Sequence, residues 1–392
     1  MKRFGYLLTG LLSASFLTVL LLQPRMDHHY SVAMSDIRSI FNLTNLQPDR
    51  SWLNVSQTND SSSCEPKGNL VFIKTHKTGS TTLRNILNRY GLSNNLSFLL
   101  NKEQVVGHIM SPSKPTYITD FLPPIGVEVG DYQNYQFNIS NIHMRPNWKE
   151  LRQLMNPSTI YMTILRHPVD QWLSSYQYFH HYKIVEPLRF WEPDPVKAFL
   201  KFPAKFKEWS AIVCNQQFRD MEFSMTNGDL NDTSFIRKKI KDYSALFSLV
   251  LITEYFDESL ILLKRLLCWK FDDILYIKMR EQPNPLQADS SSREQIQELN
   301  KADMMLYTHF NETFWQMVDE YGPDFEKDLR YFRDHLNAMQ EECVGESKVA
   351  IVAGNHENIK YKVKAKSEIC KSIVNYGYAM EAMKRQQKRA TV

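Results

Sequence analysis

Residues 74–82 combine charged side chains and small residues that can bind an anion. The segment reads Lys-Thr-His-Lys-Thr-Gly-Ser-Thr-Thr, with an apolar run before it and a helical pattern after it. Successive backbone N–H groups and the positive end of the helix would therefore face one site, beside the ammonium group of Lys77. The hydroxyls of Ser80, Thr81 and Thr82 can donate to anionic oxygens. The segment predicts a binding site for a phosphate-like anion.

A second segment of the same kind, residues 161–176, begins with an apolar run that ends before Arg166. Pro168 favours the first turn of a helix, because its missing N–H costs little there. Ser174, eight residues after Arg166, would lie about two turns into that helix. A guanidinium binds a phosphate through two parallel hydrogen bonds, and a serine hydroxyl can join it. The two segments together predict a ligand with two separated anionic groups.

The order of residues in the first segment differs from that of the nucleoside-triphosphate P-loop. That motif places its lysine directly after the last glycine, whereas Lys77 precedes Gly79. The sequence also lacks an obvious aspartate for Mg²⁺ after a later predicted strand. A kinase or nucleoside triphosphatase is therefore disfavoured.

Short apolar runs alternate with helical patterns along the body of the chain, and this order is typical of an α/β fold. Ligands of such folds bind beyond the carboxyl ends of the parallel strands. Both anion-binding segments directly follow a predicted strand, so we expect them to meet at one edge of a mainly parallel sheet. The predicted strands are 69–74, 139–143, 159–165, 249–253 and 274–278. The predicted helices are 82–89, with Gly91 beyond its end, 168–181, 256–269 and 293–321.

The composition is that of a globular protein and limits the classes of function. The 392 residues are 43% hydrophobic and 23% charged, and a net charge of +4 is too small to indicate nucleic-acid binding. The five cysteines form no Cys-x-x-Cys pair and no His/Cys cluster at zinc spacing. We expect one or two long-range disulfides, a leftover thiol and no structural metal.

The N-terminus is predicted to anchor the protein in a membrane. Lys2 and Arg3 precede residues 4–22, an apolar run of 19 residues, and about 20 residues span a bilayer. Positive charges on the short side predict a cytosolic tail, residues 1–3, and a lumenal remainder. A cleaved signal peptide is the alternative, but the run is long and no small-x-small cleavage site follows it.

The remainder divides into a polar, flexible stem (23–67), a catalytic domain (68–340) and a C-terminal extension (341–392). Asn-x-Ser/Thr sequons support a lumenal location for these parts, because asparagine in this pattern accepts N-linked glycans in the secretory pathway. The candidate glycosylation sites are Asn42, Asn54, Asn59, Asn95, Asn138, Asn231 and Asn311.

The two anion-binding segments resemble the signatures with which sulfotransferases bind 3′-phosphoadenosine 5′-phosphosulfate (PAPS). The closer similarity is to the galactose-3-O-sulfotransferases, Golgi carbohydrate sulfotransferases that include the galactosylceramide (cerebroside) enzyme. It runs in order from about residue 70 to residue 332. The matching stretches are 72–82, 143–145, 252–260 and 306–315. Two positions depart from the family pattern: His167 stands where an aspartate is expected, and Pro146 where an aromatic residue is expected.

The resemblance implies a P-loop-like sulfotransferase domain with a central, mainly parallel sheet flanked by helices. It implies a single-pass, type II Golgi membrane enzyme that moves a sulfuryl group from PAPS, by in-line displacement, to a terminal β-galactose. O3 is the expected position, on a glycolipid or a glycoprotein glycan. Arg166 and Ser174 would hold the 3′-phosphate, and Lys77 would neutralise the leaving oxygen. The 5′ end would be held by Lys74, Thr75, Lys77, Thr78, Gly79, Ser80, Thr81 and Thr82.

The acceptor hydroxyl of such a reaction needs a base, and histidine suits neutral or mildly acidic pH. His76 lies inside the first anion-binding segment. His143 ends a predicted strand, where the related hexuronyl 2-O-sulfotransferases also carry a base histidine. His108 is a weaker third candidate, and the sequence does not choose among them.

Three questions stay open at this point. The acceptor could be another glycan, as in a hexuronyl 2-O-type enzyme, or the protein could be an inactive lumenal glycan-binding protein. The sequence leaves both a monomer and a homodimer open.

The aromatic residues of 172–182 are interpreted as helix packing and not as a sugar-binding platform.

Overall fold

The computed structural model describes residues 50–54, 64–100, 121–179, 181–188, 190–202, 214–222, 226, 228–352 and 356–389. All of these belong to one unit of the chain, Ile37–Val392. The predicted anchor (4–22), His108, Asn42 and Asn59 lie outside the described residues. Within the described part, no helix has both the length and the apolar character needed to cross a membrane.

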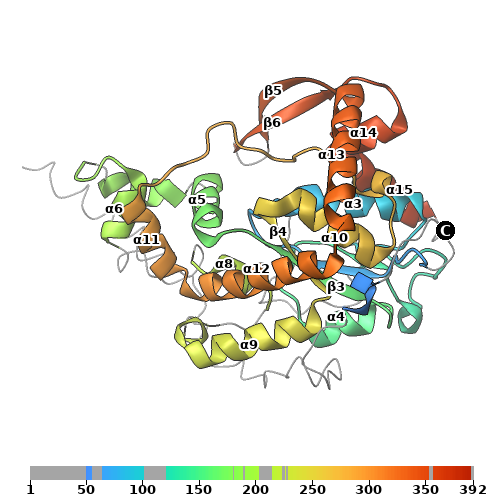
Figure 1. The fold of residues 1–392 in the computed structure, drawn as a ribbon, viewed down its shortest axis with the longest axis horizontal. Coiled ribbons are helices and arrows are strands. Elements are labelled where there is room, and N and C mark those ends of the chain that lie inside the picture. Colours follow the sequence, from blue (N-terminus) through green and yellow to red (C-terminus); the bar gives the residue numbers. More distant parts are fainter. Residues whose placement is uncertain are drawn as a thin grey trace, which may run out of the picture. The chain divides into compact units, whose positions relative to one another are not determined.

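Four short strands form a parallel sheet at the centre of the molecule (Figure 1). In chain order they are β1 (Leu70–Ile73), β2 (Ile139–Ser140), β3 (Ile160–Leu165) and β4 (Leu249–Ile252). Their order across the sheet is β2-β1-β3-β4, and every neighbouring pair is parallel. All side chains of β1 and β4 are buried, as expected for strands that are covered on both faces. The carboxyl ends of β1, β3 and β4 therefore lie at one edge of the sheet.

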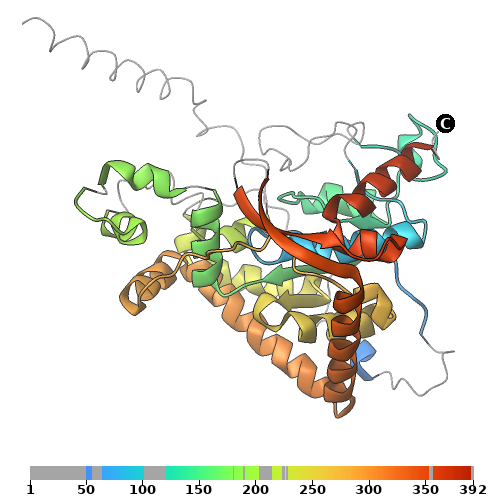
Figure 2. The same cartoon turned by 90° about the horizontal axis from the view of Figure 1, so that it is seen from above.

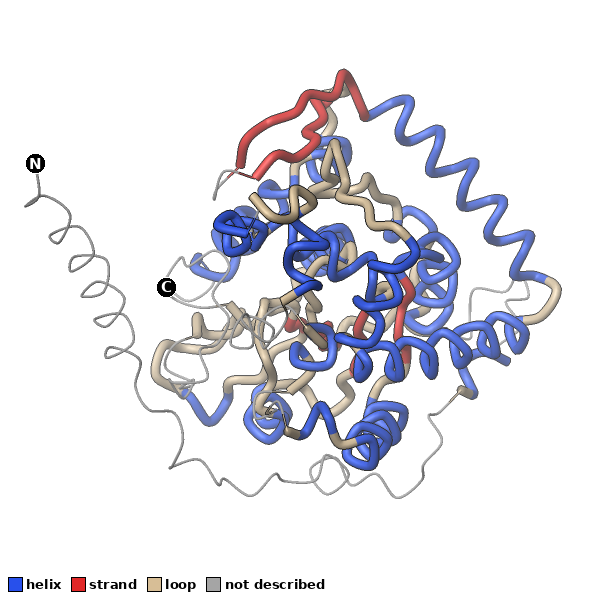
Figure 3. The backbone as a smooth tube through the Cα atoms, turned by 90° about the vertical axis from the view of Figure 1, so that its left-hand side faces the viewer, coloured by secondary structure: helices blue, strands red, loops and turns tan. Residues whose placement is uncertain are grey.

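Helices flank this sheet, and in Figure 1 α3 and α15 lie on one side of the strands and α9 on the other. Figure 3 shows the central strands enclosed by helices. The predicted α/β fold with a central parallel sheet is confirmed. The helices before the C-terminal extension are α3 (Ser80–Ser93), α4 (Trp148–Leu154), α5 (Pro168–Tyr178), α6 (Pro195–Lys201), α8 (Gln216–Asp220), α9 (Thr233–Leu246), α10 (Phe256–Leu267), α11 (Ser290–Leu299), α12 (Lys301–Tyr321) and α13 (Asp324–Cys343). Short 3-10 helices lie at Ser51–Asn54, Tyr132–Asn134, His181–Leu188, Asp229–Asn231, Thr253–Tyr255 and Phe271–Ile274.

The sequence predicted that the first helix ends before Gly91, and this prediction is wrong. Helix α3 continues through it to Ser93. A Cβ at this position would collide with the ring of Phe98 and with Ile139. The glycine therefore permits close packing of α3 against its neighbours.

The long helix predicted at 293–321 is in fact two helices, α11 and α12, which are separated at Asn300. The Asn300 side chain accepts a hydrogen bond from the backbone N–H of Asn215 at 2.8 Å and donates to the carbonyl of Ile296 at 2.7 Å. A buried asparagine that bonds to backbone groups competes with the helical hydrogen bonds, and this explains the break.

The predicted strand at 274–278 is also wrong. Ile274 ends a 3-10 helix, and the following residues form a loop. The apolar character of this run is explained by burial, since Leu275, Tyr276 and Ile277 are all buried. The strand predicted at 139–143 ends at Ser140.

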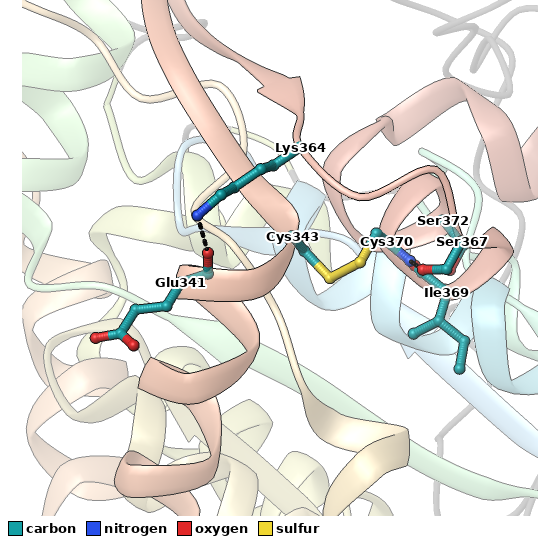
Figure 4. The surroundings of a disulfide bond; sticks show 7 residues. All are labelled: Glu341, Cys343, Lys364, Ser367, Ile369, Cys370 and Ser372. Atoms are coloured by element: carbon teal, nitrogen blue, oxygen red, sulfur yellow. Dashed lines mark hydrogen bonds between the residues drawn. A yellow bond between two sulfur atoms is a disulfide. The ribbon is translucent and has the colours of Figure 1, made fainter.

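The C-terminal extension folds onto α3 and α13. It consists of a two-stranded antiparallel hairpin, β5 (Val344–Val352) and β6 (His356–Val363), and two helices, α14 (Glu368–Val374) and α15 (Tyr376–Arg389). Helix α15 packs on α3 (Figure 2), and the hairpin lies at one edge of the fold, at the top of Figure 1. A disulfide between Cys343 and Cys370 joins the end of α13 to α14 (Figure 4).

The expectation of one or two disulfides and a leftover thiol is confirmed. A second disulfide joins Cys64 to Cys268, and Cys214 is a buried free cysteine. Residues 50–54, within the predicted stem, also pack on this body. Leu53 is buried, and its carbonyl accepts a hydrogen bond from Arg265 at 3.0 Å.

Candidate active site

The loop 74–79 joins β1 to α3 at the carboxyl edge of the sheet. Lys77 and Gly79 both have left-handed backbone conformations, with φ of 59° and 72°. This φ is uncommon for a residue with a Cβ, and such strain is concentrated at functional sites. At Gly79 an added Cβ would have room, since Thr253 is its nearest contact at 3.7 Å, so the glycine is needed for φ alone. Helix α3 starts directly after Gly79, and its first N–H groups lie at this edge.

Several of the predicted ligand-binding hydroxyls stabilise the loop itself. Thr75 Oγ1 donates to a backbone carbonyl of β3 at 2.5 Å and lies 2.7 Å from Thr78 Oγ1. Ser80 Oγ donates to the carbonyl of Thr75 at 2.7 Å. Thr82 Oγ1 accepts from the backbone N–H of Met279 at 2.9 Å. We therefore expect these hydroxyls to fix the shape of the loop, while its N–H groups and the surrounding cations meet the ligand.

Positively charged side chains gather around this loop. Lys74 is buried, and its Nζ donates to His143 Nε2 at 2.9 Å. Lys77 Nζ lies 3.8 Å from the ring centroid of Tyr178, within the range of a cation–π interaction. Arg280 Nη1 donates to the hydroxyl of the same tyrosine at 2.9 Å. The loop after β1, the end of α5 and the segment after residue 278 thus meet at one ring.

Burial and repulsion from neighbouring cations lower the pKa values of the two lysines. Burial, with smaller contributions from Arg166 and Arg280, lowers the pKa of Lys77 to about 7. Burial and repulsion from Arg84 and Arg280 hold the pKa of Lys74 well below its usual range. An anionic ligand would offset this repulsion and restore the charge of both lysines. The electrostatics therefore favour a strongly anionic ligand.

The second anion-binding segment contacts the first. Arg166 directly follows β3, and its Nη1 donates to the carbonyl of Lys77 at 3.3 Å. The side chain of Gln217 holds the Arg166 backbone, accepting from its N–H at 2.8 Å and donating to its carbonyl at 2.9 Å. Ser174 lies half-buried on α5. The structure thus brings the two segments together as predicted, and the joint action of Arg166 and Ser174 on one phosphate stays a prediction.

The two candidate histidines stack on each other. The rings of His76 and His143 have centroids 4.3 Å apart and are inclined by 27°. His76 Nδ1 lies 2.8 Å from the carboxylate of Asp220, the last residue of α8. His143 is in the loop after β2, where burial, with repulsion from Lys74 and His76, holds its pKa well below the usual range. The two imidazoles therefore have different partners: the Asp220 carboxylate for His76 and the Lys74 ammonium for His143.

A profile of the galactose-3-O-sulfotransferase family matches residues 2–388. The chain belongs to this family. The family resemblance and the enzyme class predicted from the sequence, a sulfotransferase, are therefore confirmed.

Individual relatives agree with this membership. The sulfotransferase is 32% identical to "Galactose-3-O-sulfotransferase 2" of Mus musculus over 71% of its own chain and 70% of the relative. It is 33% identical to "Galactosylceramide sulfotransferase" of Homo sapiens over 72% of its chain and 65% of the relative. It is 31% identical to "Galactose-3-O-sulfotransferase 3" of Homo sapiens over 71% of its chain and 63% of the relative. The matched part spans a little under two thirds of the last two relatives.

Three residues of the sulfotransferase site were missed by sequence reasoning. Asp220 and Arg280 come from segments that carry no recognisable motif. Tyr178 was included in the aromatic cluster that we interpreted as helix packing. That interpretation holds for Trp172 and Tyr176, which are buried and stacked at 4.7 Å. Tyr178 instead lies against the Lys77 ammonium, at the end of the same helix.

Two features of the described residues bear on where the chemistry takes place. No group of three or more His, Cys, Asp or Glu side chains there is arranged to hold a metal ion. A cavity of about 850 Å³ lies between α9 and α12, lined by apolar side chains such as Met304 and Phe310 and by polar ones such as Lys241 and Glu312. None of the predicted site residues lines this cavity, so the chemistry is placed at the carboxyl edge of the sheet.

Proposed function

We propose that the protein is a PAPS-dependent galactose 3-O-sulfotransferase, which transfers a sulfuryl group to O3 of a terminal β-galactose. The observation that carries this proposal is the hydrogen bond from Arg166 to the carbonyl of Lys77. It joins the two segments that resemble the 5′-phosphosulfate and 3′-phosphate signatures, so one donor molecule with two anionic ends can contact both. The printed names of the relatives, galactose-3-O-sulfotransferase and galactosylceramide sulfotransferase, support galactose as the acceptor.

The residues around the loop fit this donor in charge. Burial, together with repulsion from Arg166 and Arg280, lowers the pKa of Lys77 to about 7, and the phosphates and the sulfate of PAPS would supply the missing negative charge. We assign the 5′ end of the donor to Lys77, Gly79 and the N–H groups at the start of α3. We assign the 3′-phosphate to Arg166 and Ser174. When bound, PAPS supplies the sulfuryl group that the acceptor oxygen takes up.

The protein supplies charge stabilisation and a base. Lys77 neutralises the negative charge that develops on the leaving oxygen. Stabilisation of this charge is the main contribution of a protein to this type of transfer. His76 accepts the proton of the acceptor hydroxyl at Nε2, because its Nδ1 is held by Asp220. His143 is the weaker candidate, since its Nε2 already accepts a hydrogen bond from Lys74 and its pKa is held low. We infer that His143 supports the stacked His76 ring and positions Lys74.

We further propose that the enzyme resides in the Golgi membrane, anchored by residues 4–22 with the catalytic domain in the lumen. The support is the cationic and apolar N-terminal sequence, together with the sequons. The two disulfides among the described residues add to it, because disulfides persist in the oxidising secretory pathway. The acceptor is a galactose-terminated glycan or a galactolipid, and the protein acts as a monomer or a homodimer.

Transfer of radiolabelled sulfate by the full chain in detergent tests the function. The acceptors are lactose, N-acetyllactosamine, galactosylceramide and a desulfated glycosaminoglycan, with Lys77→Ala as the control. We expect label on a galactoside, at O3 by linkage analysis, and loss of label in the variant. Label only on the glycosaminoglycan would support a hexuronyl 2-O-type enzyme and refute the galactose assignment. Binding of adenosine 3′,5′-bisphosphate without transfer to any acceptor would contradict the proposed activity.

A further inference from the structure

Asp220 makes an unusually complete set of contacts with one catalytic candidate. Its carboxylate accepts the backbone N–H of His76 at 2.7 Å, and both of its oxygens lie 2.8 Å from His76 Nδ1. The Asp220 side chain is 2% exposed and that of His76 is 15% exposed. A carboxylate can only accept, so Nδ1 must carry the hydrogen of this pair. The lone pair of the neutral ring is then left on Nε2.

The short helix that carries Asp220 is itself fixed on two sides. Asp303 of α12 accepts the backbone N–H groups of Gln217 at 3.1 Å and Phe218 at 2.8 Å, at the start of α8. The Gln217 side chain bonds to both backbone groups of Arg166 at the end of β3. The carboxylate of Asp220 is therefore held by the same element that holds the second anion-binding segment.

The surroundings of His76 make a carboxylate partner necessary. The His76 ring stacks on that of His143. The cations Lys74, Arg84 and Arg280 repel positive charge on His143. A proton that arrives on His76 would thus enter a group of cations. Asp220 is the group in direct contact with the ring that can offset this positive charge.

We propose that Asp220 is a positioning residue of the transfer reaction, which holds His76 with Nε2 free to accept a proton and stabilises the imidazolium that results. In this step the O–H bond of the acceptor breaks, its proton bonds to Nε2, and the oxygen keeps the electron pair. The proton leaves to solvent after the products dissociate. This inference rests on the proposed role of His76 as the base.

The variant Asp220→Asn tests the proposal with little change in shape. Its amide group donates to Nδ1 and so favours the opposite tautomer, in which Nε2 carries the hydrogen. We expect kcat to fall by about 100-fold or more, because general base catalysis contributes about 10²- to 10⁴-fold. The KM for PAPS and the Kd for adenosine 3′,5′-bisphosphate should stay within about twofold, since the donor-binding cations are unchanged.

A matched control separates positioning from folding. Glu222, two residues beyond α8, forms a buried ion pair with Lys239 at 2.5 Å and does not contact His76. Glu222→Gln should lower the Tm while kcat stays as in the wild type. If Asp220→Asn lowers the Tm but changes kcat no more than Glu222→Gln does, Asp220 has only a structural role.

The tautomer can be measured without turnover. In protein labelled with [¹⁵N]histidine and saturated with adenosine 3′,5′-bisphosphate, the His76 ring should show hydrogen on Nδ1 in the wild type and on Nε2 in Asp220→Asn. The signal is assigned with His76→Gln. The same tautomer in both proteins would overturn the proposal.

The double variant distinguishes this proposal from the assignment of the base. If Asp220 acts through His76, Asp220→Asn should reduce kcat no further in a His76→Gln background than His76→Gln does alone. Full turnover in His76→Gln would refute His76 as the base, and the role of Asp220 with it. Loss of turnover in His76→Gln, with normal kcat in Asp220→Asn, would refute the role of Asp220 alone.

Discussion

The ammonium group of Lys77 lies 3.8 Å from the centroid of the Tyr178 ring, at the end of helix α5. The hydroxyl of this tyrosine accepts a hydrogen bond from Arg280 at 2.9 Å. One aromatic side chain thus contacts two cations, one through its face and one through its oxygen. The contact holds the Lys77 side chain beside the anion-binding loop at the cost of burying its charge, which lowers its pKa to about 7.

Removing the ring should weaken donor binding. A cation–π contact contributes about 0.5–2 kcal/mol, which corresponds to about 2- to 30-fold in affinity. We expect Tyr178→Ala to raise the Kd for adenosine 3′,5′-bisphosphate within this range, as measured by calorimetry. Tyr178→Phe keeps the face of the ring and loses the hydroxyl that contacts Arg280, so its effect should be smaller. Equal losses in the two variants would show that the hydroxyl, and not the face, is the important part.

The lowered pKa of Lys77 makes anion binding depend on pH. Below about pH 7 the lysine of the free site is charged, and above it the site must take up a proton to bind the anion with full strength. We expect the Kd for adenosine 3′,5′-bisphosphate to rise by up to about tenfold per pH unit between about pH 7 and 9. Calorimetry in buffers with different ionisation enthalpies should show proton uptake in this window.

The lowered pKa of Lys77 makes anion binding weaker as the pH rises, but it has the opposite effect on the stability of the fold. An unfolded lysine keeps its proton up to about pH 10.4, so between about pH 7 and 10 the unfolded chain binds more protons than the folded one. The contribution of Lys77 to stability therefore rises with pH across this window.

Lys77→Arg keeps its charge throughout and should abolish the proton uptake on binding. Proton uptake of the same size in Lys77→Arg would assign the titration to another group.

Local features of the site could be predicted from the sequence. The loop 74–79 lies between a buried strand and a helix that are adjacent in the chain, so its backbone geometry and Lys77 follow from local order. Arg166 is at the end of another such strand, and the parallel arrangement brings the two together. These predictions needed only strand–helix alternation and the rule that parallel strands share their carboxyl edge.

The partners of these residues could not be predicted in this way. Asp220 meets His76 across 144 residues of sequence, and no pattern around it indicates a site. Arg280 follows an apolar run that the sequence suggests is a strand, although its residues are buried as a loop. Its φ of 55° also has no signature in the sequence. Tertiary packing, and not local propensity, decides such positions.

The C-terminal extension should stabilise the catalytic body. The Cys343–Cys370 disulfide closes a segment of 27 residues, and cross-links of this length contribute about 3 kcal/mol by restricting the unfolded chain. Helix α15 is tied to the body through Gln387, which donates to the carbonyls of Phe98 at 2.9 Å and Pro123 at 2.8 Å.

We expect the double variant Cys343→Ser, Cys370→Ser to lower the free energy of unfolding by about 2–4 kcal/mol in urea. Cys214→Ser is the matched control, because Cys214 is buried and forms no disulfide. A smaller loss in the double variant than in this control would mean that the cross-link adds little to the packing of the extension.

Glycan occupancy should differ among the sequons according to their surroundings. Asn231 is exposed at the end of a 3-10 helix, where a glycosyltransferase can reach its amide. The side chain of Asn138 is instead committed to the fold. It accepts the backbone N–H of Ser97 at 2.9 Å and donates from Nδ2, the atom that would carry the glycan, to Asn69 at 2.8 Å.

We therefore expect peptide mapping of the secretory-pathway product to find a glycan on Asn231 and none on Asn138. Asn138→Gln should lower stability by about 1–3 kcal/mol without changing the glycan mass, because it displaces a partly buried amide that satisfies a backbone N–H. Asn231→Gln should remove one glycan and leave the free energy of unfolding of the deglycosylated protein unchanged. A glycan on Asn138 would mean that modification precedes the packing of β2 against β1, since the folded amide is engaged between Ser97 and Asn69.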